Sequence, residues 1–178
     1  MNLPGDFEVV FSEERIRART RELGAGITRD LLADDPAAEL VAVGILKGSL
    51  LFMADLVREI RVPLYCDFLR VASYEGMEST GVVRLEFDLT QPIAGKHVLI
   101  VEDIIDTGLT MRFLLENLRL KKPRSLKVCS LLDKPANRKA PVEVDYVGFT
   151  IPNRFVIGYG LDLEGLYRNL PYIAAKRV

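Results

Sequence analysis

The chain has 178 residues, of which 49% are hydrophobic and 28% charged, and its formal net charge is −1 at pH 7. This length fits one domain with a hydrophobic core, and the composition is ordinary for a soluble enzyme. Acidic and basic residues are interspersed, which argues against a nucleic-acid-binding or membrane-binding surface. The acidic N-terminal stretch lacks a signal-peptide pattern and no apolar run approaches membrane-spanning length, so we expect a cytoplasmic protein.

The N-terminal part of the sequence predicts a short extended segment and then a helix. We expect the extended segment over residues 1–11. Ser12 can cap a helix whose first turn carries Glu13 and Glu14, the charges that a helix N-terminus favours. Apolar residues then recur on one helical face as far as the stop signal Asp-Asp-Pro at 34–36.

A strand, a loop and a helix are predicted between residues 39 and 60. Segment 39–46 is typical of a buried strand, and segment 49–60 predicts the helix after it. The connecting residues Leu46, Lys47 and Gly48 lie at the carboxyl end of the strand, where backbone N–H groups and an ammonium group could bind an anion. Taken alone, this loop is more simply a plain turn with a solvated lysine.

Two further strands are predicted at 65–72 and 82–87, where the residues alternate in polarity. The segment between them, residues 73–81, is polar and punctuated by glycine. It is either a long hairpin loop or a mobile lid, because long irregular loops in compact domains often close active sites.

The stretch at 98–110, VLIVEDIIDTGLT, has the clearest chemical pattern in the chain. Its apolar start predicts a strand buried on both faces, and acids followed by a turn into a helix describe the crevice where open α/β sheets bind ligands. Gly108 allows a tight turn whose N–H groups can bind phosphate, and Thr107 is a candidate N-cap. The stretch lacks the Walker A pattern of nucleoside-triphosphate-binding loops.

The acidic residues of this stretch need partners other than phosphate. Glu102 and Asp103 would repel a bare phosphate, so they must serve sugar hydroxyls, a divalent cation or a developing positive charge. Asp106 lies beside the phosphate turn and could act as a general base. An acidic pair one turn from a phosphate cradle suits a sugar phosphate better than a nucleoside triphosphate.

The remaining elements predicted are a helix at 111–120, a buried strand at 125–132 and a short strand at 144–147. Lys127 is unusual in a buried strand, and in isolation it fits a snorkelling edge residue as well as a functional one.

The two cysteines and the single histidine carry little functional signal. Cys66 and Cys129 are far apart in strand-like runs, so we expect buried free thiols in a reducing compartment. His97 precedes the central strand without a second metal ligand near it in the sequence, and we expect it to be structural.

The stretch VLIVEDIIDTGLT resembles the phosphoribosyl-pyrophosphate signature of the type I phosphoribosyltransferases. Its Glu-Asp pair, two isoleucines and Asp-Thr-Gly are similar to the form found in the hypoxanthine-guanine branch. The resemblance extends from about residue 41 to about residue 168 and includes the Leu-Lys-Gly loop and the segment 148–162. Patterns this long arise by chance far more rarely than short motifs.

The resemblance implies the type I phosphoribosyltransferase fold, an α/β fold with a mostly parallel central sheet flanked by helices and a small hood region. We expect a single domain over 1–178, with its core at about 36–150. The hood would come from the N-terminal segment and from about 151–178. The family forms dimers and tetramers, so a homodimer or homotetramer is expected, with no nucleic-acid or membrane partner.

The resemblance also implies how phosphoribosyl pyrophosphate is bound. The 5-phosphate would lie on residues 106–110, the ribose hydroxyls on the Glu-Asp pair, and the pyrophosphate on the Leu-Lys-Gly loop, which in this family tends to carry a cis peptide before its lysine. The residues predicted to bind this substrate are Leu46, Lys47, Gly48, Glu102, Asp103, Asp106, Thr107, Gly108, Leu109, Thr110 and Arg168. The predicted cofactor is Mg²⁺, with Glu102, Asp103 and Asp162 as its candidate ligands.

The purine site is implied by the same resemblance. Phe155 would stack on the base, the Val156 backbone would bond its edge, and Lys127 would contact its exocyclic oxygen. Asp162 is placed at the same site, bound to magnesium on the pyrophosphate. Each of these residues alone is explained as well by an ordinary core, turn or surface position.

Two further features of the resemblance concern the lid and one departure from the family pattern. Ser73 and Tyr74 resemble the Ser-Tyr pair of the flexible loop that folds over the reaction centre, where exclusion of water limits hydrolysis. Leu109 stands where some members have lysine, which removes one cation. The phosphate would then depend more on backbone N–H groups and on Thr107 and Thr110.

The implied reaction joins hypoxanthine or guanine to the sugar and releases pyrophosphate. Purine N9 forms the new bond, Asp106 handles the proton at N7, and carboxylates stabilise an oxocarbenium-like sugar. Two alternatives stay open. One is a different base, such as xanthine or, less favourably, adenine, because a lysine donates hydrogen bonds and suits a 6-oxopurine. The other is a non-enzymatic regulator that binds phosphoribosyl pyrophosphate, against which the lack of a basic stripe and the intact Asp106 argue.

Overall fold

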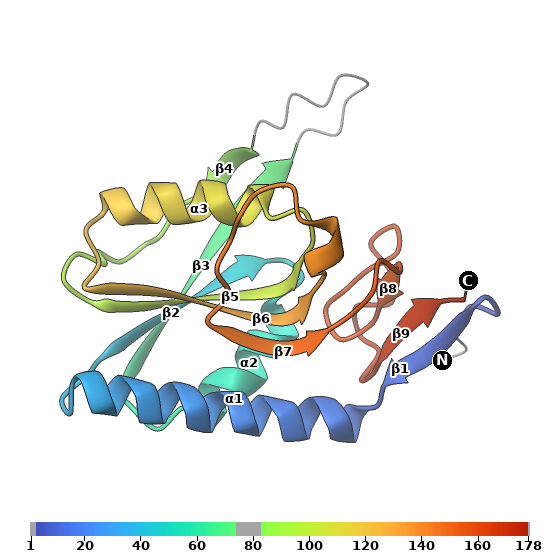
Figure 1. Ribbon diagram of the computed structural model, residues 1–178, viewed down its shortest axis with the longest axis horizontal. Helices are drawn as coiled ribbons and strands as arrows, with labels where there is room; N and C mark the ends of the chain where they lie inside the picture. Colours follow the sequence, from blue (N-terminus) through green and yellow to red (C-terminus); the bar gives the residue numbers. More distant parts are fainter. Residues whose placement is uncertain (1–2, 74–82, 178) are drawn as a thin grey trace.

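The computed structural model describes residues 3–73 and 83–177. Within these residues the chain forms a large sheet with helices on both faces and a small sheet near the two termini (Figure 1). The strands are β1 (Phe7–Phe11), β2 (Leu40–Leu46), β3 (Leu64–Ser73), β4 (Val83–Phe87), β5 (His97–Ile105), β6 (Ser125–Asp133), β7 (Tyr146–Thr150), β8 (Val156–Ile157) and β9 (Ile173–Lys176). The helices are α1 (Glu13–Asp34), α2 (Leu50–Glu59) and α3 (Leu109–Leu120), with a 3-10 turn at Pro135–Asn137.

The large sheet has the strand order β4-β3-β2-β5-β6-β7 and is parallel except at β4, which is antiparallel to β3. The strands β2 and β5 are almost entirely buried, as expected for parallel strands covered on both faces. The chain leaves β2 toward β3 but leaves β5 toward β6, on the other side. Open α/β sheets bind ligands beyond the carboxyl ends of the strands at such a switch point.

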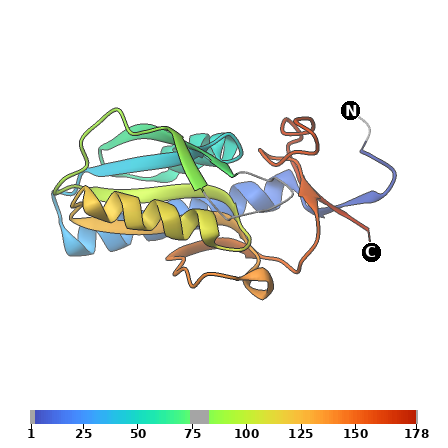
Figure 2. The same ribbon diagram turned by 90° about the horizontal axis from the view of Figure 1, so that it is seen from above.

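The helices cover opposite faces of this sheet. Helices α1 and α2 pack on one face and α3 on the other (Figures 1 and 2). The predicted cap of α1 is confirmed, because Ser12 Oγ accepts a hydrogen bond of 3.4 Å from the Arg15 N–H. Ile16, Leu23 and Ile27 are buried on one side of α1, and each such side chain contributes about 2 kcal/mol to folding. None of the described helices is long and apolar enough to cross a membrane.

The small sheet has the order β1-β9-β8 and is antiparallel. Its strand β1 confirms the extended segment predicted at the N-terminus. The other two strands were not predicted, because β8 has only two residues and β9 pairs with the opposite end of the chain. Phe7, Ile157, Leu170 and Ala174 form a core beneath this sheet, separate from the cores of the large sheet.

The structure corrects three local predictions. The last strand of the large sheet, β7, begins and ends later than the predicted 144–147. The N-cap of α3 is Gly108 and not Thr107, because the chain adopts a left-handed conformation there that glycine tolerates best. Cys66 is exposed, since β3 lies near the edge of the sheet, whereas Cys129 is buried as predicted; both are free thiols.

Candidate active site

The turn after β5 forms an anion-binding geometry at the start of α3. Gly108 has a φ of +81°, and a Cβ there would lie 2.7 Å from the Ala140 carbonyl oxygen, so the turn requires glycine. The N–H groups of Thr107, Gly108 and Thr110 donate no hydrogen bond to any residue that the structure describes. They border a cavity of about 110 Å³. Free N–H groups at a helix N-terminus are the usual partners of a phosphate.

The predicted acidic pair lies in the last part of β5. Glu102 is buried, and burial first, then the neighbouring charge of Asp103, raises the pKa of Glu102 well above its usual value. Burial also raises the pKa of Asp103, although a hydrogen bond from Glu102 and the charge of Arg168 oppose this shift. The two carboxyl groups are therefore incompletely compensated by the protein, and hydroxyl donors or a cation would stabilise them.

The loop between β2 and α2 packs directly on this pair. Its Leu46–Lys47 peptide bond is cis, as the family resemblance implied. A Cβ on Gly48 would lie 1.6 Å from Asp103 Oδ2, so only glycine admits the carboxylate at this point. Lys47 is exposed at the carboxyl edge of the sheet. The structure thus brings together two groups of predicted site residues that are more than fifty positions apart in sequence.

A second cavity, of about 260 Å³, adjoins the first, and both are lined by Ile104 and Asp106. Phe155 borders this second cavity with 48% of its surface exposed, so an aromatic face is available to a ligand. Its full lining consists of Asp103, Ile104, Asp106, Lys134, Phe155, Val156, Leu161 and Asp162. A planar, apolar ligand with a polar edge would fit such a lining.

Asp106 connects the two cavities and is held by residues that the sequence analysis missed. Lys134 Nζ lies 3.4 Å from Asp106 Oδ2, and Asn137 Nδ2 donates a hydrogen bond of 2.9 Å to Asp106 Oδ1. The side chain of Lys134 is only 8% exposed. Its position was a usable signal, because Lys134 immediately follows β6 and the carboxyl ends of parallel strands meet at one edge.

Asp162 and Arg168 lie at this edge but bind each other. Arg168 Nη2 is 2.6 Å from Asp162 Oδ1, and Asp162 Oδ2 accepts a hydrogen bond of 2.7 Å from the Gly165 N–H. In the described part of the chain, no three or more His, Cys, Asp and Glu side chains are placed to hold a metal ion together. Asp162 pairs with Arg168 here and is not clustered with Glu102 and Asp103, so the assignment of these three residues as Mg²⁺ ligands stays a prediction.

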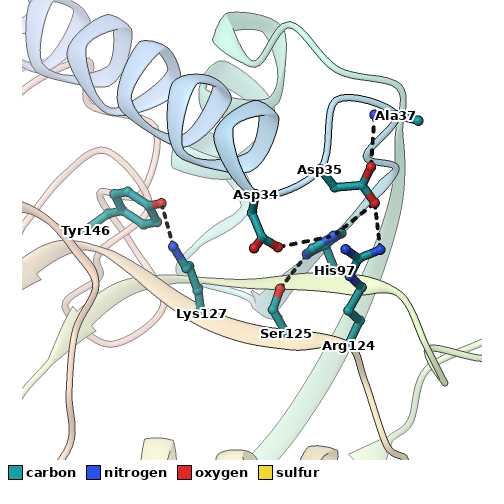
Figure 3. A network of polar contacts seen from close by, with 8 residues as sticks. All are labelled: Asp34, Asp35, Ala37, His97, Arg124, Ser125, Lys127 and Tyr146. Atoms are coloured by element: carbon teal, nitrogen blue, oxygen red, sulfur yellow. Dashed lines mark hydrogen bonds and ion pairs between the residues drawn. The ribbon is translucent and has the colours of Figure 1, made fainter.

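The predicted contact between Lys127 and the purine is wrong. Lys127 lies near the start of β6 and its Nζ is 3.4 Å from Tyr146 Oη, at the edge opposite the two cavities (Figure 3). At about 3.3 Å per strand residue, it is about 20 Å from Asp133, where β6 ends. Lys134 is the lysine of this strand that borders the second cavity.

His97, which we expect to be structural, lies outside this site. His97 is buried at the amino edge, where its Nδ1 is 2.7 Å from Ser125 Oγ (Figure 3). Acidic groups that are distant in sequence lie near it in space, because its Nε2 is 3.8 Å from Asp35 Oδ2 and 4.0 Å from Asp34 Oδ2.

The predicted lid is only partly described. Ser73 is the last residue of β3, and Tyr74 lies outside the described residues together with the loop up to residue 82.

Comparisons with known proteins agree with this arrangement. A family model described as a phosphoribosyl transferase domain matches residues 14–164. A hypoxanthine-guanine phosphoribosyltransferase from Staphylococcus epidermidis is 52% identical over 170 residues, covering 95% of this chain and 93% of that protein. A hypoxanthine phosphoribosyltransferase from Salmonella typhimurium is 50% identical over 167 residues, with 93% of each chain covered. A solved structure of a hypoxanthine phosphoribosyltransferase from Staphylococcus aureus is 49% identical with a TM-score of 0.89, covering 96% of this chain and 91% of that one.

Proposed function

Because the chain belongs to the phosphoribosyl transferase family, we propose that it transfers the phosphoribosyl group of phosphoribosyl pyrophosphate to hypoxanthine or guanine. The products are IMP or GMP and pyrophosphate, so the reaction salvages purine bases. The observation that carries this proposal is the meeting of two cavities at Asp106. One has N–H groups that donate to none of the described residues and suit a phosphate, and the other has an aromatic side chain suited to a base.

The sugar substrate is bound along the carboxyl edge of β2 and β5. Its 5-phosphate accepts hydrogen bonds from the N–H groups and hydroxyls of residues 106–110, at the N-terminus of α3. Its ribose hydroxyls donate to Glu102 and Asp103, which supplies the compensation that these buried carboxyls otherwise lack. Lys47 and the backbone of the Leu-Lys-Gly loop offset the charge of the pyrophosphate, and Arg168 contributes from the other side.

The acidic pair also fits the expected Mg²⁺. This ion is usually held by one or two carboxylates together with waters and substrate oxygens, so it needs no cluster of three protein ligands. Glu102 and Asp103 would hold it next to the ribose hydroxyls, and when bound it offsets charge on the leaving pyrophosphate.

The base lies in the second cavity. Phe155 stacks on its plane, and the backbone of Val156 at the start of β8 bonds its edge. Lys134, and not Lys127, donates a hydrogen bond to the exocyclic oxygen at C6 of the base. An ammonium group only donates hydrogen bonds, which favours a 6-oxopurine over adenine.

The chemical step replaces a carbon–oxygen bond by a carbon–nitrogen bond. Purine N9 attacks C1 of the ribose as the bond to pyrophosphate breaks, and the pyrophosphate leaves with the bonding electron pair. Positive charge develops on the sugar, and the carboxylates of Glu102 and Asp103 stabilise it. Asp106 accepts the proton from purine N7 as general base, held in place by Lys134 and Asn137.

The rest of the molecule supports this reaction. We assign the small sheet, which includes the N-terminal strand, and residues 151–178 to a hood over the base. Residues from about 36 to 150 form the core. The segment that includes Tyr74 is assigned to a lid, the assembly to a homodimer or homotetramer, and the compartment to the cytoplasm. Two free thiols suit that reducing compartment.

A radioactive-base transfer assay tests the proposal directly. The purified chain, Mg²⁺ and phosphoribosyl pyrophosphate are incubated in turn with labelled hypoxanthine, guanine, xanthine and adenine. We expect mononucleotide formation with the first two bases and much less with adenine. Preference for xanthine would identify a xanthine phosphoribosyltransferase, and binding of phosphoribosyl pyrophosphate without transfer to any base would leave the regulator.

A further inference from the structure

We propose that Tyr159 is a positioning residue of the active site, which acts through a hydrogen bond to Asp55 and holds the pyrophosphate loop in its binding geometry. The pyrophosphate loop is defined here as Leu46, Lys47 and Gly48. This inference rests on the proposed function, because it concerns how the same site binds phosphoribosyl pyrophosphate. Neither residue borders the two cavities, so their effect must travel through the residues between them.

Tyr159 is buried in an unusual backbone conformation. Only 7% of its surface is exposed, and its hydroxyl donates a hydrogen bond of 2.6 Å to Asp55 Oδ2 on α2. Its φ is +47°, and the glycines on either side, Gly158 and Gly160, also have positive φ values. A non-glycine residue adopts this region only when its surroundings hold it there. The hydrogen bond to α2 is one of the contacts that do so.

The hydroxyl of Tyr159 stays protonated under assay conditions. Burial first, and then the hydrogen bond to Asp55 and its negative charge, raise the pKa of Tyr159 above its ordinary value. The group therefore remains a donor throughout the neutral range, and the contact with α2 persists.

The residue after Tyr159 touches the pyrophosphate loop itself. A Cβ on Gly160 would lie 2.0 Å from the Gly48 carbonyl oxygen, so the two backbones are in direct contact. On its other side, Gly48 packs against the carboxylate of Asp103. Gly48 is thus held between Gly160 and Asp103, and a shift of the Tyr159 turn would release one side of it.

The same turn also positions Arg168. The Gly160 N–H donates a hydrogen bond of 2.9 Å to the Arg168 carbonyl oxygen, and Arg168 Nη1 donates one of 2.6 Å to the Gly160 carbonyl oxygen. The partner of Tyr159 is also connected to the pyrophosphate loop, because Asp55 lies on α2 and α2 begins right after that loop. The Tyr159–Asp55 hydrogen bond therefore joins the two segments that enclose the leaving pyrophosphate.

This geometry predicts a selective kinetic defect. Loss of the Tyr159 hydroxyl should weaken binding of phosphoribosyl pyrophosphate more than binding of the base, because Gly160 contacts Gly48 and Arg168 directly. Phe155 and Lys134 of the base cavity lie outside this turn. For Tyr159→Phe we expect the KM for phosphoribosyl pyrophosphate to rise about 5- to 10-fold, the size of effect that the loss of one ordinary hydrogen bond produces. The KM for hypoxanthine should stay within about twofold, a split that general destabilisation would not produce.

The chain offers a matched control. Tyr146 also donates a hydrogen bond to an aspartate, of 3.1 Å to Asp30 Oδ2, but at the opposite edge of the sheet. Tyr146→Phe removes the same group from the same kind of pair, so it should lower the melting temperature comparably and leave both KM values unchanged. Asp55→Ala and the double variant with Tyr159→Phe complete a cycle. If the two residues act as one unit, the double variant has the KM of either single variant.

The experiment measures both KM values, the melting temperature and the calorimetric affinity for phosphoribosyl pyrophosphate with Mg²⁺. An unchanged KM in Tyr159→Phe, an equal rise in Tyr146→Phe, or additive effects in the double variant would overturn the positioning role. These results leave the proposed function intact, because the wild-type protein still transfers the base. Absence of both transfer and phosphoribosyl pyrophosphate binding in the wild-type protein would overturn the proposed function and this inference with it.

Discussion

At the amino edge of the large sheet, most polar side chains bind one another (Figure 3). Lys127 contacts Tyr146, Tyr146 contacts Asp30, and Arg124 binds Asp35. At the carboxyl edge, by contrast, the N–H groups of Thr107, Gly108 and Thr110 donate to no residue in the described part of the chain, and burial raises the pKa of both acids at the end of β5. Both edges are built from lysines, aspartates and glycines.

The difference teaches that backbone N–H groups without a partner among the described residues, next to buried carboxyls, indicate the site better than residue type does. Groups that are already paired stabilise the fold, whereas groups that lack partners can exchange water for a ligand. Residues at the carboxyl edge should therefore affect activity more than stability, and the corresponding residues at the amino edge should do the reverse. Pairs of substitutions, one at each edge, test this comparison.

The largest effect is expected for Asp106→Asn. The amide keeps the size of the carboxylate but cannot accept the N7 proton, so kcat should fall by about 10²- to 10⁴-fold. The KM for phosphoribosyl pyrophosphate should change little, because the N–H groups that bind the phosphate stay in place. Steady-state kinetics measures both. An equal loss of turnover and of affinity for the sugar substrate would remove Asp106 from the catalytic role.

Asp35→Asn is the counterpart at the amino edge. It weakens the ion pair with Arg124, whose Nη1 is 2.7 Å from Asp35 Oδ2, and leaves the cavities untouched. We expect slightly lower stability and unchanged kcat.

The second pair of substitutions concerns two lysines, Lys127 near the start of β6 and Lys134 just after its end. Lys134→Met removes the donor proposed for the 6-oxo group and should lower kcat/KM for hypoxanthine by about 10- to 100-fold. Lys127→Met should leave kcat/KM within about twofold, since Lys127 is at the far end of the strand. A larger effect of Lys127→Met would reverse the comparison between the edges. Initial rates at varied hypoxanthine concentration give kcat/KM for both variants.

These two lysines also show how much of the fold and of the candidate site could be predicted from the sequence. The buried strand at 98–101, the acids after it and the turn at Gly108 are local patterns, so they predicted the type of fold correctly and led to the cavity at the carboxyl end of β5. The choice of Lys127 failed because a buried strand has two ends and the motif match did not say which end the base occupies. The rule that ligands bind at carboxyl ends would have selected Lys134.

Other features could not be predicted from local patterns. Asn137 reaches Asp106 through a turn after β6, and β9 pairs with β1 from the opposite end of the chain. The ion pair between Asp162 and Arg168 depends on a backbone turn with several left-handed residues, which no periodicity signals. Contacts of this kind are set by tertiary packing and not by the residues next to them.

The third pair compares two left-handed glycines. Gly108→Ala places a Cβ against the Ala140 carbonyl oxygen and should cost about 2–3 kcal/mol in the free energy of unfolding, with a clear rise in the KM for phosphoribosyl pyrophosphate. Gly95 precedes β5 at the amino edge with a φ of +72° and nothing within 4 Å of a new Cβ. Gly95→Ala should cost only the backbone term, about 1 kcal/mol, and leave KM unchanged. Urea denaturation measures the free energy of unfolding of both variants, and steady-state kinetics measures their KM for phosphoribosyl pyrophosphate.

The smallest effect is a gain in stability for Glu102→Gln. Since the pKa of Glu102 in the folded protein lies above its ordinary value of 4.5, the folded state binds more protons than the unfolded state between these two values. The free energy of unfolding therefore falls as pH rises through this window. Glutamine does not titrate, so the ligand-free variant should melt at a higher temperature than the wild type near pH 8, and the gain should shrink toward pH 5.

The exposed Glu39, just before β2 at the amino edge, supplies the control, and Glu39→Gln should leave the melting temperature near pH 8 unchanged, because its side chain is already in solvent. Phosphoribosyl pyrophosphate with Mg²⁺ should then reverse the ranking for Glu102→Gln, because a ligand stabilises the protein that binds it more tightly by the larger amount, and we expect that protein to be the wild type. A variant that is less stable than the wild type without ligand would mean that the ionised Glu102 is already compensated inside the protein. The carboxyl edge would then resemble the amino edge, and the unpaired acids could not be what draws the ribose and the cation to this site.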